Sequence, residues 1–352
     1  MNKNKFRGKN IFNGNYKGGE NKNYYNKNKY RSKDEIIHEE YLKQFEIISA
    51  PNNFSLIDNP EETIIFINKL EDCYLLKKQV YVDIKNISYL DYSAVTVLVS
   101  VMFSFKERNI KFDGNLPDDL FLAKKLIDSD FFKNLKKQIS SKIEYSVGKQ
   151  NQIFTRAHKE VNSELGLLVM EEASLTIWGE KRTCKGLQRT LLELMQNTNN
   201  HASVSSKGEK HWWLSVNHDI ANKKVSFIFV DYGIGIFESL KNKPPENKWF
   251  GWWEKLNNNI KSNLNFNYEV LKLLLEGEMH MTVTGKHFRG KGLPGIKEAY
   301  ERGQISNLSV ISNDVYANVN KNIYYRLENE FSGTFVSWEL NTNNVNLKWI
   351  IE

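Results

Sequence analysis

The chain has 352 residues, of which 40% are hydrophobic and 12% aromatic, which allows a sizeable core and two domains of ordinary size. Its two cysteines form neither a disulfide framework nor a paired metal motif, so we expect a reducing, cytoplasmic setting. The N-terminus lacks the apolar segment of a secretory signal, and the longest apolar run, residues 94–105, is too short to span a bilayer.

The positive charge is concentrated at the N-terminus. Residues 1–33 hold eight Lys and two Arg against one Glu, a balance of +9, so the net charge of +7 leaves −2 for the remaining residues. Asn, Lys, Gly and Tyr recur there with few aliphatic side chains, too little to offset the entropy of ordering. We therefore predict that residues 1–34 are a disordered tail. The tail either keeps the chain soluble or binds RNA, DNA or an anionic surface, with its tyrosines stacking on bases.

Residues 35–146 alternate between strand and helix patterns, which predicts an α/β domain. Strands are expected at residues 45–49, 80–84 and 110–112. Helices are expected at residues 61–75 and 94–105, with a third ending at residue 127. The polar residues 128–146 are expected to lead into a second domain.

That second domain is predicted to cover residues 151–342. Its helices are expected at residues 151–177, 185–199 and 295–302. Its strands are expected at residues 211–216, 225–230, 308–311 and 334–340. Residues 237–288 are rich in Asn and Lys, and we expect a long irregular segment there. Its tryptophans either pack this segment closed or face a partner; they include Trp249, Trp252 and Trp253.

Two polar motifs lie at the ends of predicted elements. Glu193 and Asn197 are four residues apart, on one face of a helix. An amide oxygen placed this way can ligate Mg²⁺ while the carboxylate orients a water, although a solvated helix face has the same pattern. Asp231 ends an apolar strand and is followed by Gly233 and Gly235. A carboxylate there can accept a hydrogen bond from an adenine amino group, and the glycines let the backbone approach a ligand. An ordinary Asp-Gly turn at the end of a strand has the same sequence pattern.

Two further motifs follow. The run Arg289-Gly290-Lys291-Gly292-Leu293 precedes a predicted helix, where backbone N–H groups and the two basic side chains can hold phosphate oxygens. Its spacing is that of neither a P-loop nor a dinucleotide-binding loop. Thr334 follows Gly333 at the last strand, where its hydroxyl can support the adenine-binding Asp through a water, or simply belong to a β-turn.

In this order and spacing, the four motifs resemble the GHKL, or Bergerat-fold, ATP-binding domain shared by histidine kinases, type II topoisomerases, mismatch-repair ATPases and anti-sigma-factor kinases. The resemblance covers residues 151–342 and implies an α/β sandwich that binds ATP and Mg²⁺ beneath a lid. It implies that Glu193 is a general base, that Asn197 holds Mg²⁺ and that Asp231 recognises adenine. The same resemblance assigns the glycine segments to the lid and Thr334 to the adenine site.

Two positions depart from the kinase members of that family. The residue three after the Mg-binding Asn, often basic in kinases, is Asn200 here. His158 is followed by Lys-Glu-Val-Asn and lacks the surroundings of a phosphoacceptor on a dimerisation helix. We therefore expect an ordinary surface or helix histidine, and not a classical autophosphorylating histidine kinase.

The sequence Asp91-Tyr92-Ser93-Ala94 after a buried strand resembles the loop of STAS-like domains, relatives of anti-sigma-factor antagonists. The resemblance covers residues 45–135 and implies a partner-binding module whose first loop Ser accepts a phosphate. That position is Tyr92 here, which leaves Ser93 as the neighbouring hydroxyl.

Together the motifs predict a soluble, Mg-dependent ATPase that acts as a nucleotide-driven switch on a protein partner through its STAS-like domain. One alternative is a serine/threonine protein kinase of the anti-sigma-factor kind. The other is a nucleic-acid-associated binding protein that uses the basic tail and holds nucleotide only as a ligand.

Overall fold

The structure is a computed structural model that describes residues 33–128, 145–147, 153–158, 163–201, 211–241, 266–276, 292–344 and 350–351. The chain forms two compact units, Met1–Lys43 and Gln44–Glu352. In the first unit the described element is helix α1 (Lys33–Leu42). The predicted disordered tail lies outside the described residues up to residue 32.

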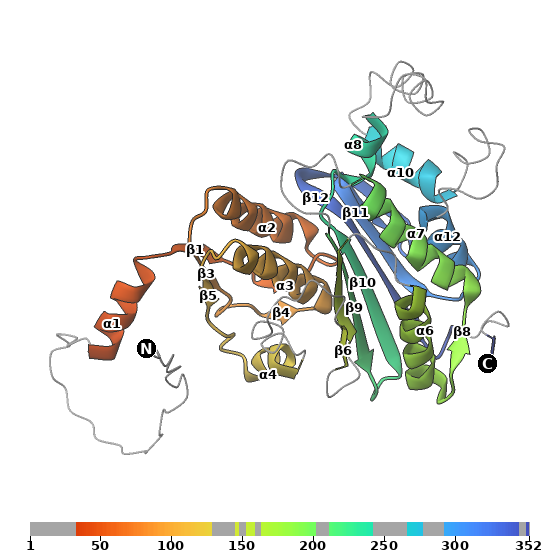
Figure 1. The fold of residues 1–352 in the computed structure, drawn as a ribbon, viewed down its shortest axis with the longest axis horizontal. Coiled ribbons are helices and arrows are strands. Elements are labelled where there is room, and N and C mark those ends of the chain that lie inside the picture. Colours follow the sequence, from red (N-terminus) through yellow and green to blue (C-terminus); the bar gives the residue numbers. More distant parts are fainter. Residues whose placement is uncertain are drawn as a thin grey trace, which may run out of the picture. The chain divides into compact units, whose positions relative to one another are not determined.

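The N-terminal half of the second unit, residues 44–128, combines two small parallel sheets with helices (Figure 1). Strands β1 (Glu46–Ser49), β3 (Val80–Asp83) and β5 (Phe112–Gly114) pair in parallel in the order β1-β3-β5. Strand β2 (Asn53–Phe54) pairs in parallel with β4 (Tyr89–Leu90). The helices are α2 (Pro60–Leu75), α3 (Tyr92–Glu107) and α4 (Leu120–Asp128). The α/β alternation predicted for this part of the chain is confirmed.

The starts of α2 and α3 follow from their sequence. Pro60 occupies the first turn of α2, where a missing N–H costs nothing, and Glu61 and Glu62 complement the positive end of the helix dipole. Asp91 caps α3, because its carboxylate accepts the N–H of Ala94 at 3.1 Å. Asp91, the first residue of the loop that resembles the STAS-like phosphate-accepting loop, is thus the cap of a helix.

The C-terminal half of the second unit is built on a six-stranded antiparallel sheet with the order β11-β12-β10-β9-β7-β6. The strands are β6 (Tyr145–Val147), β7 (Ile153–His158), β9 (His211–Asp219), β10 (Lys224–Asp231), β11 (Ser306–Asn318) and β12 (Ile323–Asn341). The helices are α6 (Ser163–Trp178), α7 (Lys185–His201), α8 (Gly235–Lys241), α10 (Phe266–Glu276) and α12 (Gly292–Glu301). Strands β8 (Arg182–Thr183) and β13 (Ile350–Ile351) form a separate antiparallel pair.

This sheet is covered on both faces (Figure 1). Successive side chains of a strand point to opposite faces. On β10, Phe227 and Phe229 join the core beneath α6, α7, α10 and α12, and we call this side the helical face. Ile228 and Val230 join a second core with α2 and α3, and we call this side the outer face. The N-terminal half therefore packs on the outer face of the C-terminal sheet.

Two predictions about the C-terminal half are wrong. Residues 151–177 do not form one helix, because β7 pairs with β9 before α6 begins. The apolar spacing predicted a helix there, but the pairing of β7 with β9 decides the conformation of residues 153–158. Residues 237–288 are not wholly irregular, since they include most of α8 and all of α10, whose buried Val270, Leu271, Leu274 and Leu275 follow helical spacing. The rest of that segment, with its tryptophans, lies outside the described residues.

Among the described helices, none has the length and apolar composition of a membrane span. Cys73 is buried in the core between the N-terminal half and the outer face of the sheet. Cys184 is buried in the core on the helical face.

Candidate functional site

Asp231 ends β10 on the helical face of the sheet. Val225, Phe227 and Phe229 point to the core beneath the helices, and Asp231 continues the same alternation. Its Cα partner on β12 is Thr334, whose neighbours Val336 and Trp338 also belong to the helical-face core. The register thus brings Asp231 and Thr334 side by side on one face.

One oxygen of the Asp231 carboxyl has no hydrogen-bond donor among the described residues. This Oδ1 atom is buried and has no hydrogen-bond partner there. Burial raises the pKa of Asp231 to about 7, and a hydrogen bond from Thr198 of α7 opposes that rise. A buried, unpaired carboxylate oxygen is costly unless something donates to it, which marks this position as a binding-site candidate.

Glycines let the backbone close around this carboxyl. A Cβ atom on Gly233 would lie 3.1 Å from Oδ1 of Asp231, tighter than ordinary side-chain contacts. Gly333 has a φ of +124°, and a Cβ there would collide with the carbonyl oxygen of Asp231. Position 333 therefore requires glycine, whereas a side chain at Gly233 would press on the Asp231 carboxyl.

The start of α8 is held by two residues of β11 that the sequence analysis missed. The Ser312 Oγ accepts the N–H of Ile236 at 2.9 Å and lies 3.2 Å from Thr334 Oγ1. Asn313 donates to the carbonyl of Ile234 at 2.9 Å. A Cβ on Gly235, whose φ is +75°, would collide with the Asn313 side chain. The polar run Ser-Asn-Asp between the apolar residues Val310-Ile311 and Val315-Tyr316 is the signal that could have found them.

Glu193 lies on α7 with one satisfied oxygen and one unsatisfied oxygen. Arg189, one turn earlier, donates through Nε to Glu193 Oε1 at 3.1 Å. Oε2 is buried and accepts no hydrogen bond from the described residues. Asn197 occupies the next turn of α7, and its side chain lies outside the described part of the chain.

Helix α7 packs closely against α12, the helix that begins within the predicted phosphate-binding run. Thr190 and Glu193 are three residues apart, so they share a face of α7. A Cβ on Gly295 of α12 would lie 2.6 Å from Thr190 Oγ1, which places this face against α12. Gly292 and Leu293 open α12, and Leu293 packs on the helical-face core. Arg289, Gly290 and Lys291 lie outside the described residues.

The structure thus gathers Asp231, Gly233, Gly235 and Thr334 at the C-terminal end of β10. Helix α7 connects this group to the other predicted residues, because Thr198 reaches Asp231 while Thr190 meets α12. Among the described residues, no group of three or more His, Cys, Asp or Glu side chains is arranged to hold a metal ion.

The second predicted loop, at the start of α3, is occupied by structural contacts. Ser93 is 1% exposed, and its Oγ donates to Asp91 while accepting the N–H of Leu56 at 3.0 Å. Tyr92 is half-buried, with Lys125 Nζ 5.1 Å from its ring centroid. The Ser93 hydroxyl is therefore engaged in holding the loop to β2 and α3.

Comparison with models of protein families, with curated proteins and with solved structures finds no match to the chain.

Proposed function

We propose that the C-terminal half binds ATP with Mg²⁺ on its helical face and acts as a GHKL-type ATPase. The observation that carries this proposal is the unsatisfied Oδ1 of Asp231, buried beside Thr334 at the end of β10. The exocyclic amino group of adenine is a donor of the required kind, and it would remove the cost of the unpaired oxygen. The resemblance of the sequence to that family assigns the same role to the same residue.

The remaining residues of the site fit a nucleotide as well. The second unsatisfied oxygen, Oε2 of Glu193, lies on α7, where it would orient and deprotonate an attacking water. Asn197 would supply an amide oxygen to Mg²⁺, and residues 289–293 would hold the phosphates at the start of α12. Bound Mg-ATP would supply the γ-phosphoryl group that this chemistry transfers to water.

The N-terminal half would carry the nucleotide state to a partner. Tyr232, the residue after Asp231, turns to the outer face, where it joins the core built with α2 and α3. Its hydroxyl lies 2.6 Å from Ser100 Oγ on α3. A change around Asp231 would thus reach a helix of the STAS-like module through one residue, which is the basis for a nucleotide-driven switch acting on a protein partner.

Titration calorimetry with ATP and Mg²⁺ tests the binding proposal. We expect Asp231→Asn to weaken ATP binding by at least tenfold, because a hydrogen bond to a charged group contributes about 1.5–3 kcal/mol. GTP should bind poorly, since it presents a carbonyl oxygen where adenine has its amino group. Asp72→Asn, an exposed change on α2, is the matched control. Equal ATP affinity in the parent and Asp231→Asn would refute the adenine assignment.

Radiolabelled ATP separates the competing reactions. Release of free phosphate, lost in Glu193→Gln while ATP still binds, supports the ATPase. Label on a protein partner or on the chain itself would instead support the serine/threonine kinase. For the nucleic-acid alternative, deletion of residues 1–32 should abolish salt-dependent RNA binding if the tail is its source.

A further inference from the structure

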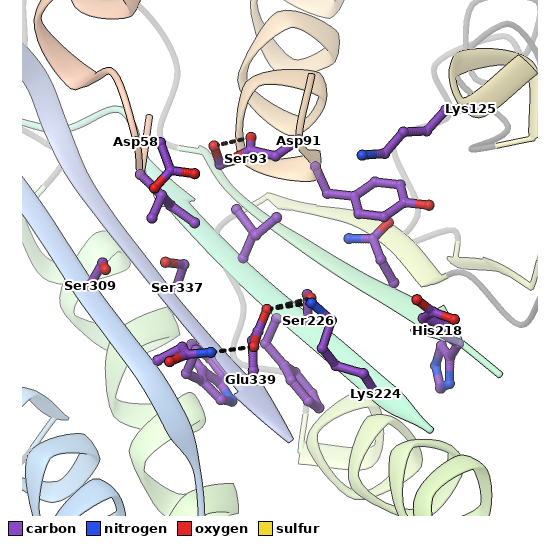
Figure 2. A pocket seen from close by; sticks show the side chains of 18 of the residues that line it. Asp58, Asp91, Ser93, Lys125, His218, Lys224, Ser226, Ser309, Ser337 and Glu339 are labelled. Carbon is purple, nitrogen blue, oxygen red and sulfur yellow. Dashed lines mark hydrogen bonds and ion pairs between the residues drawn. The ribbon is translucent and has the colours of Figure 1, made fainter. Parts of the chain in front are cut away.

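The outer face of the C-terminal sheet changes from apolar to polar along its strands. On β10, Val230 and Ile228 lie in the core with α2 and α3, whereas Ser226 and Lys224 follow at the other end. On β12, Ser337 and Glu339 continue the outer face in the same way. This polar end lines a cavity of about 1060 Å³, whose opposite wall comes from the loops around Asp58 and Asp91 and from α4 (Figure 2).

The cavity contains a polar atom for which the described residues provide no partner. Ser337 is 4% exposed, and its Oγ is buried without a hydrogen bond. In Figure 2, Ser337 and Ser309 lie on neighbouring strands on the side of the sheet that faces Asp58 and Ser93. Leaving a buried hydroxyl unpaired is costly, and a rotation of the Ser337 side chain that brings Oγ to a ligand in the cavity would gain affinity.

Two carboxylates and two lysines of the cavity, Glu339 with Lys224 and Asp91 with Lys125, attract each other within the protein. Four carboxylate residues and four lysines are among the described residues that line it. Lys224 Nζ lies 3.0 Å from Glu339 Oε1, and Asn307 Nδ2 donates to Glu339 Oε2 at 2.5 Å. On the opposite wall, Lys125 donates to the carbonyl of Leu90 at 2.6 Å and also attracts Asp91.

The Asp91 carboxylate already accepts three hydrogen bonds from neighbouring residues. It accepts Ser55 Oγ at 2.5 Å, the Ala94 N–H at 3.1 Å and the Ser93 hydroxyl. A ligand carrying a strong charge would have to compete with these internal pairs and would lose its own hydration. An uncharged ligand with many hydrogen-bonding groups does not compete with these pairs, and its desolvation costs less than that of an ion.

Aromatic side chains of the wall add a second kind of contact. Tyr89 and Phe121 line the cavity and are 44% and 75% exposed. Rings in this position can pack against the C–H faces of a sugar while serine and asparagine side chains bond its hydroxyls. The volume lies slightly above the range of about 300–1,000 Å³ for small-molecule sites, so it admits a ligand larger than a single sugar ring.

We propose that this cavity is a second ligand site, separate from Asp231, that binds an uncharged polyhydroxylated molecule of about disaccharide size. The site lies on the outer face of the sheet, whereas Asp231 lies on the helical face. Its occupant would contact both halves of the second unit, because the walls come from both.

Titration calorimetry with millimolar maltose, trehalose and sucrose tests the proposal, with glucuronate and glucose 6-phosphate as charged probes. We expect one-to-one binding of at least one disaccharide and weaker binding of both charged probes. Ser337→Ala should weaken the disaccharide about fivefold, the effect of one hydrogen bond. Phe121→Ala, at an exposed position that cannot unfold the core, should also weaken it severalfold.

Two controls isolate the site. Ser104→Ala removes a hydroxyl of α3 that bonds the carbonyl of Ser100 and does not line the cavity, so it should leave disaccharide binding unchanged. Asp72→Asn, an exposed change on α2 that does not line the cavity, should also leave it unchanged. The proposal is overturned if no disaccharide binds, if the charged probes bind more tightly, or if both Ser337→Ala and Phe121→Ala bind like the parent.

Discussion

The hydroxyls of Tyr232 and Ser100 lie 2.6 Å apart, across the boundary between the C-terminal sheet and helix α3. Ser100 also donates to the carbonyl of Val97 at 2.6 Å, and the Tyr232 ring packs near Phe331 with 6.0 Å between centroids. Burial raises the pKa of Tyr232, which keeps its phenol protonated and able to donate. The residue beside the candidate adenine carboxylate is therefore anchored in the N-terminal half.

This contact predicts that Tyr232→Phe uncouples the halves with a small loss of stability. The ring remains packed and Ser100 keeps its bond to Val97, so the free energy of unfolding should fall by only about 1 kcal/mol. ATP should still bind, but its protection of α3 amides in hydrogen exchange should shrink. Tyr300→Phe, whose hydroxyl bonds the exposed Asn320, should leave that protection intact. Undiminished ATP-dependent protection in Tyr232→Phe would show that the contact does not transmit the nucleotide state.

The raised pKa of Asp231 predicts that the ligand-free protein loses stability as pH rises. The native state keeps the proton up to a pKa of about 7, whereas the unfolded chain releases it near 3.8. Stability should therefore fall between these values, by at most about 4 kcal/mol. In denaturant unfolding across this range, the free energy of unfolding of Asp231→Asn should rise relative to that of the parent as pH increases. Above neutrality, Asp231→Asn should be the more stable of the two. Parallel curves for the two proteins would mean that the carboxyl is not buried in solution.

The close approach of Gly333 to Asp231 predicts that Gly333→Ala is strongly destabilising. The positive φ and the collision of a Cβ with the Asp231 carbonyl both have to be relieved by moving β12 away from β10. We expect a loss of several kcal/mol in the free energy of unfolding. Gly186→Ala on α7 is the matched control, because a Cβ there meets nothing within 4 Å and alanine favours a helix. A mild effect at Gly333 would show that this strand end is loosely packed.

The parts of the candidate site that depend on a local motif could be predicted from the sequence. The parts that depend on long-range packing could not. Asp231 and Gly233 were identified because a strand end followed by Gly-x-Gly is readable within a few residues. The pairing of Asp231 with Thr334 and the anchoring of α8 by Asn313 depend on strands about 80 to 100 residues away along the chain. For the same reason the outer-face cavity had no sequence signal, since its walls combine loops near Asp58 with strands of the C-terminal half.

The buried histidine of β9 predicts sensitivity to acid. His218 is 4% exposed, its Nδ1 lies 2.7 Å from the Thr176 hydroxyl of α6, and its Nε2 has no partner among the described residues. Burial lowers the pKa of His218 to about 4, whereas the unfolded chain takes up the proton near 6.5. Stability should therefore fall as pH drops from 6.5 to 4, by up to roughly 3 kcal/mol from this residue. In denaturant unfolding, His218→Gln should lose less stability over that range than the parent. His38→Gln, at an exposed position of α1, should lose as much as the parent. An acid response of equal size in His218→Gln and the parent would place its origin in other groups.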